Sequence, residues 1–128
     1  MRRRTGSAAV EFAFAAPVMM LLLAGVVEWG YYIQREQLVV QAVRDGALAG
    51  SAVLDHDDAE TVAQQRTTDG LELAGFADAD FDVNVTTSTD DAGDVVTVSA
   101  DVTYGPVLNM LPTPDTLHAE STFRLVDQ

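Results

Sequence analysis

An apolar run near the N-terminus is the feature that most constrains this chain. It extends from Phe12 to Val27 without a charged residue, and Glu11 and Glu28 bracket it. These 16 residues are fewer than the roughly 20 that span a bilayer as a helix, but uncharged flanks lengthen the stretch. We therefore predict a transmembrane helix over residues 7–32, with each glutamate near a headgroup region. The aromatic residues of the outer interface would be Trp29, Tyr31 and Tyr32.

A basic segment, Arg2 to Arg4, precedes this run. A cleaved secretory signal begins in the same way, but it ends in an A-x-A-like site, and none follows the run. We therefore predict that the span is retained as an anchor. The positive-inside rule then places the N-terminus in the cytoplasm and the C-terminal part outside, which is the topology of a single-pass inner-membrane protein.

The charge of the chain is concentrated beyond the predicted span. The net charge is −13, and residues 55–128 hold 16 acidic residues against Arg66 and Arg124. Binding to a phosphate backbone requires clustered Lys and Arg, so nucleic acid is excluded as a partner. The absence of cysteine excludes disulfides and thiolate metal sites.

Residues 33–54 keep apolar and small residues at helical spacing, which predicts that the membrane helix continues on the exoplasmic side. Ala42, Gly46 and Gly50 form a stripe of small residues along it. One interpretation is close packing against a neighbouring helix. The other is that the helix frays and ends near Gly50, since glycine disfavours helix.

Residues 55–128 are expected to form a small acidic α+β domain. A helical pattern over residues 57–74 predicts a short second helix. Alternation of apolar and polar residues over residues 81–86, 96–104 and 117–125 predicts three strands of an antiparallel sheet with one wet face. Residues 89–94 would form a hairpin connection, and the proline-containing residues 105–116 an irregular crossover.

Candidate chemical sites in this acidic part are weak. His118 and Glu120 offer two metal ligands without a third, and the grouped aspartates lack the pattern of a calcium loop. Asn84 begins a glycosylation sequon inside a predicted strand. Nucleotide-binding and nucleophile motifs are missing, so we expect no enzymatic activity, no cofactor and no metal site.

The segment RTGSAAVEFA, residues 4–13, resembles the start of a type IV pilin-like precursor, with a basic leader, a glycine, a small residue and a following glutamate. The longer segment AAVEFAFAAPVMMLLLAGVVEWG resembles the TadE-like family of tight-adherence (Flp-type) pilus assembly proteins. That family typically has a Val-Glu-Phe-Ala start, then a proline, an apolar stretch, a glycine and a glutamate. The resemblance covers residues 2–50, and the motif falls on Glu11, Phe12, Pro17, Gly25 and Glu28.

The resemblance implies a pilin-like fold and a leader of residues 1–6, removed by a prepilin peptidase between Gly6 and Ser7. It also implies a pseudopilin role with other pilins, pseudopilins and Tad secretion-assembly proteins as partners in the lipid bilayer. Glu11 lies one helical turn after the amine that cleavage would expose at Ser7. Pairing with that amine of a neighbouring subunit would offset the cost of a carboxylate at the membrane edge, whereas snorkelling into headgroup water is the alternative.

For Glu28 we expect solvation at the outer membrane edge. The leading hypothesis for the chain is thus a minor pseudopilin of a Tad-type pilus. The alternative is a signal-anchored extracytoplasmic module that binds a cation or another ligand and is unrelated to pili.

Overall fold

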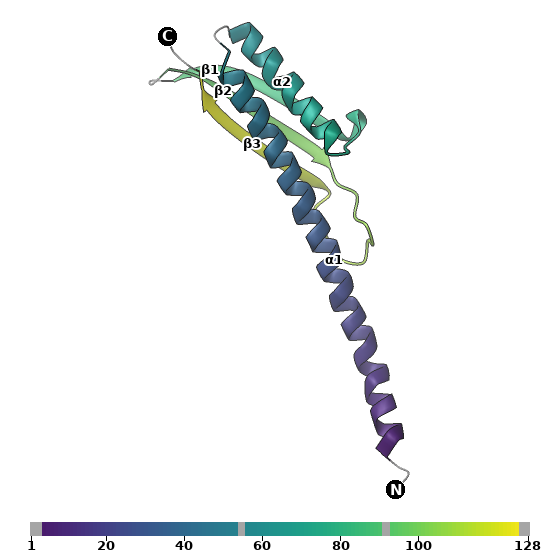
Figure 1. Ribbon diagram of the computed structural model, residues 1–128. Coiled ribbons are helices and arrows are strands. Elements are labelled where there is room, and N and C mark those ends of the chain that lie inside the picture. Colours follow the sequence, from purple (N-terminus) through teal and green to yellow (C-terminus); the bar gives the residue numbers. More distant parts are fainter. Residues whose placement is uncertain (1–3, 54–55, 91–92, 126–128) are drawn as a thin grey trace. The chain divides into compact units, whose positions relative to one another are not determined.

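The computed structural model describes residues 4–53, 56–90 and 93–125 (Figure 1). The elements in chain order are α1 (Arg4–Ser51), α2 (His56–Leu73), the 3-10 helix η1 (Asp78–Asp80), β1 (Phe81–Asp90), β2 (Gly93–Thr103) and β3 (Thr116–Arg124). The predicted α+β class is confirmed, with a long N-terminal helix, a shorter second helix and three antiparallel strands. Residues 1–3 of the predicted leader, and Asp55 and Asp91 of the aspartate groups, lie outside the described residues.

Helix α1 continues through Pro17 without a break. From Ala8 onward it is long and apolar enough to cross a membrane, by length and composition. Large apolar side chains of its N-terminal part are exposed, for example Phe14 and Met20. A helix that is apolar all round and exposed all round is suited to lipid, because in water such a surface would be costly.

The sheet has the order β1-β2-β3, and both pairings are antiparallel. Every second residue of β2 from Val96 to Val102 is fully buried, as the alternating pattern predicts. Polar residues occupy the opposite face, where Asp101 lies between Asp82 of β1 and His118 of β3. The sheet is therefore wet on one side and packed on the other.

Packing divides the described chain into two compact units. One contains α1 up to Tyr32 together with Pro106–Thr113, and the other contains Ile33–Gly105 together with the chain from Pro114 onward. In the second unit the outer part of α1 and helix α2 lie on the same face of the sheet (Figure 1). Both helices and the sheet contribute to its core: Val39, Val43, Ala47, Ala59, Ala63, Leu71, Val98 and Leu117. Residues 33–53 thus share a unit with the sheet, whereas residues 106–113 share one with the apolar part of α1.

The C-terminus of α2 is closed by a Schellman motif. Gly75 adopts a positive φ of 84°, and the N–H of Phe76 donates to the carbonyl of Leu71 at 3.1 Å. Arg35 of α1 donates to the carbonyl of Ala74 at 2.9 Å, and its guanidinium lies 4.5 Å from the centre of the Phe76 ring. A cation on an aromatic face thus ties α1 to the end of α2.

Two exposed carboxyl groups at this end make local stability depend on pH. Asp78 accepts a hydrogen bond from protonated Glu72 and repels its charged form, which raises the pKa of Glu72 above its ordinary value. This stabilisation is fully present below the unfolded-state pKa of Glu72 and is lost as the pH rises through the raised folded-state pKa. We expect Glu72→Gln, which donates at every pH, to avoid that loss. Thermal melts of both proteins from acid to neutral pH should diverge slightly, whereas a constant difference would contradict the prediction.

Candidate functional site

The carboxylate of Glu28 holds two consecutive backbone N–H groups of the crossover between β2 and β3. Its Oε1 accepts from the N–H of Val107 at 2.9 Å, and its Oε2 accepts from the N–H of Leu108 at 2.9 Å. The Glu28 side chain is fully buried. The expectation of a solvated glutamate at the membrane edge is therefore wrong. A carboxylate loses its hydrogen bonds to water when it is buried, and here the two backbone N–H groups replace them.

Gly25 lies almost one helical turn before Glu28 and faces the same crossover. A Cβ atom built on Gly25 would lie 2.9 Å from Cδ1 of Leu111, closer than real Cβ contacts. The missing side chain therefore leaves room for Leu111 against the helix. We call this arrangement the Glu28 dock, and we define it as Gly25, Glu28, Val107, Leu108 and Leu111.

The sequence did not indicate the crossover half of the dock. Val107, Leu108 and Leu111 lie about 80 positions from Glu28 along the chain, and two of them bind through backbone atoms, which leave no trace in the sequence. The usable signal is the absence of charge. Residues 102–114 form the longest uncharged stretch beyond residue 54, in a region that holds 16 acidic residues.

The other residues of the membrane-helix motif do not join this dock. Gly6 and Ser7 lie in the first turns of α1, while Glu11, Phe12 and Pro17 lie further along it and are exposed. Glu11 precedes Glu28 by 17 residues, about 25 Å along the axis of a straight helix. The motif thus contains two separate places: an exposed carboxylate near the start of α1, and a buried one near the end of the apolar run.

The stripe of small residues on α1 packs against α2 of the same chain. A Cβ atom on Gly46 would collide with Oγ1 of Thr67 and lie 2.8 Å from the carbonyl oxygen of Ala63. One on Gly50 would lie 2.8 Å from the Cβ of Ala63. Ala42, in turn, contacts α2 at Gly70. Helix α1 extends to Ser51, so both glycines lie within the helix at a close helix crossing.

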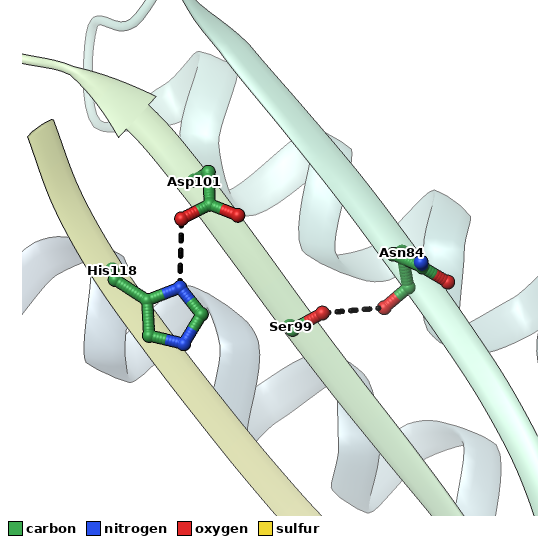
Figure 2. A network of polar contacts seen from close by, with 4 residues as sticks. All are labelled: Asn84, Ser99, Asp101 and His118. Carbon is green, nitrogen blue, oxygen red and sulfur yellow. Dashed lines mark hydrogen bonds and ion pairs between the residues drawn. The ribbon is translucent and has the colours of Figure 1, made fainter.

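Figure 2 shows two separate polar contacts on the wet face of the sheet. Nδ1 of His118 lies 2.7 Å from Oδ1 of Asp101, and both side chains are exposed. The hydroxyl of Ser99 donates to the backbone carbonyl of Asn84 at 3.4 Å. Within residues 4–53, 56–90 and 93–125, no three side chains of His, Asp or Glu come together as a metal site would require.

The fold defines a class of protein. An N-terminal helix that is long and apolar enough to cross a membrane is followed by a small α+β domain. The model of the family described as TadE-like protein matches residues 6–48. The resemblance to this family is therefore confirmed over that segment, which contains Glu11, Pro17, Gly25 and Glu28. Curated proteins and solved structures give no significant match to the chain.

Proposed function

We propose that this chain is a TadE-like minor pseudopilin that takes part in assembling a Tad/Flp-type pilus. The observation that carries the proposal is the match to the TadE-like family over residues 6–48. The match begins at the proposed cleavage position and covers the apolar part of α1. In this role the chain acts as a structural subunit and has no enzymatic activity.

The charge distribution supports the proposed topology. Three arginines precede the apolar run, and residues 55–128 carry a net charge of −14, from 16 acidic residues and two arginines. The positive-inside rule favours a cytoplasmic N-terminus and an exoplasmic α+β domain. The partners would be other pilins and pseudopilins, the Tad secretion-assembly proteins and a prepilin peptidase in the inner membrane.

Glu11 has a specific role in this proposal. Cleavage between Gly6 and Ser7 gives a new amine one helical turn before Glu11, and the Glu11 side chain is exposed on α1. A carboxylate in the hydrocarbon edge is costly alone, and a cationic amine of a neighbouring subunit reduces that cost. Glu11 would therefore align one subunit with the next during assembly.

The first test is the mature N-terminus of the protein in its native host. We expect mass spectrometry to find a chain that begins at Ser7, because Gly6 presents no side chain to a protease that approaches the membrane surface. Gly6→Leu should leave the leader attached. Gly30→Ala is the matched control, because an added Cβ there meets no atom within 4 Å, and it should be processed normally. A wild-type chain that begins at Met1, or beyond residue 25, would contradict the proposal.

A further inference from the structure

The crossover beside Glu28 presents apolar side chains to its surroundings. Val107 is 53% exposed, Leu108 43% and Met110 64%. They lie within residues 102–114, which carry no charge, although the rest of the acidic domain is rich in carboxylates. An exposed apolar patch on a segment of this kind marks a surface that contacts lipid or another protein.

The dock fixes where this segment lies along the membrane helix. Val107 and Leu108 are bonded to Glu28 at the end of the apolar run, and Leu111 lies against Gly25. Gly25 precedes Glu28 by three residues, about 4.5 Å along the axis toward the middle of the span. Beyond Glu28 lie Trp29 and Tyr32, residue types that are enriched at membrane interfaces. Their rings form an edge-to-face pair with centres 5.7 Å apart. The crossover therefore lies beside the last turns of the apolar run.

The backbone of the segment is adapted to a site that contains little water. Irregular chain at membrane depth is costly because its N–H groups lose their hydrogen-bond partners. Pro106 and Pro112 have no N–H group to satisfy. The N–H groups of Val107 and Leu108 are bonded to Glu28. Within residues 106–112, four positions thus have no N–H group that needs water as an acceptor.

From these contacts we propose that residues 106–111 form a second membrane-contacting element, which places Val107, Leu108 and Met110 in the boundary between headgroups and acyl chains of the outer leaflet. The occupant of this apolar surface is lipid, because the surface continues that of the apolar run, where Val26 is 72% exposed and Trp29 45%. Amphipathic segments in this boundary bury their apolar face to a depth of about 5–10 Å. The inference rests on the membrane anchoring of α1 that the proposed function contains.

The chain has no cysteine, so single-cysteine variants of the full-length protein can be labelled with an environment-sensitive fluorophore. In phosphatidylglycerol–phosphatidylcholine vesicles, a probe at Met110→Cys should emit at shorter wavelength, lose intensity with lipid-attached nitroxides and resist aqueous iodide. Val107→Cys should behave in the same way. The probe at Leu22→Cys, in the apolar run, reports insertion of α1, and Glu120→Cys, on the wet face of the sheet, is the aqueous control.

Each outcome separates lipid from the other environments. Quenching by iodide at Met110→Cys and Val107→Cys, with Leu22→Cys quenched by lipid nitroxides, would overturn the inference and leave the anchor intact. A short-wavelength emission that neither quencher reduces would assign the surface to a protein contact, which also overturns it. If the lipid nitroxides fail to quench the probe at Leu22→Cys, α1 is not inserted in the bilayer, and this result would contradict the proposed function as well.

Discussion

Replacing Gly46 by alanine is expected to lower the thermal midpoint of the α+β domain by about 8–16 °C. The added methyl group would collide with Thr67 and lie 2.8 Å from the backbone oxygen of Ala63, which cannot move without shifting α2. Thr67 is also constrained, because it is fully buried and its hydroxyl donates to the same oxygen at 2.8 Å. The two helices must therefore move apart.

The size of the effect follows from two opposing contributions. Overpacking costs about 1–3 kcal/mol, occasionally more, and a backbone collision places Gly46 at the upper end. The better helix propensity of alanine returns at most about 1 kcal/mol. A net loss of about 2 kcal/mol in the free energy of unfolding lowers the midpoint of a small domain by about 4–8 °C per kcal/mol.

The measurement is thermal unfolding of the full chain in detergent, followed by circular dichroism. Gly30→Ala makes the same change on the same helix, but nothing lies within 4 Å of its added Cβ. It should therefore not lower the melting midpoint, because it keeps the gain in helix propensity of at most about 1 kcal/mol and adds no collision. Gly50→Ala should also lower the melting midpoint, because its added Cβ would meet Ala63 and lie 2.9 Å from the carbonyl oxygen of Ala59. Equal melts of Gly46→Ala and Gly30→Ala would contradict a close helix crossing at this point.

The sequence allowed prediction of the parts of the fold that depend on local periodicity. Alternation identified all three strands, and helical spacing identified both helices, because each pattern is repeated over many neighbouring residues. The stripe at Gly46 had a weaker signal. Small residues indicate that something approaches closely, but they do not say what, and two interpretations remained. The partner, α2 of the same chain, follows only from the tertiary packing.

The role of Glu28 could not be predicted for a different physical reason. A glutamate at the end of an apolar run is compatible both with headgroup water and with a buried hydrogen bond, and these alternatives differ only in what lies beside it. Its donors are main-chain N–H groups some 80 residues away. Any sequence presents such groups, so only the three-dimensional arrangement distinguishes the two alternatives.

Removing the Glu28 carboxylate should therefore release the crossover and leave the sheet intact. In Glu28→Ala we expect amide hydrogen exchange at Val107 and Leu108 to accelerate by about 10- to 100-fold, because a hydrogen bond to a charged group contributes about 1.5–3 kcal/mol and about 1.4 kcal/mol corresponds to a factor of ten. Glu28→Gln keeps one acceptor oxygen and should give a smaller acceleration, concentrated at one of the two amides. Glu36→Ala, at an exposed glutamate of the same helix, is the matched control.

A second variant tests the dock without changing the carboxylate. Gly25→Val would place a branched side chain where Leu111 lies, since even a Cβ comes within 2.9 Å of its Cδ1. Gly25→Ala should have a milder effect, because the end of a leucine side chain can rotate away. If the crossover is held as described, Gly25→Val and Glu28→Ala should accelerate exchange at the same two amides, while β2 stays protected in both. Unchanged exchange at Val107 and Leu108 in Glu28→Ala would mean that the carboxylate does not hold the crossover. Faster exchange throughout β2 would mean that the dock also stabilises the sheet, which its contacts do not require.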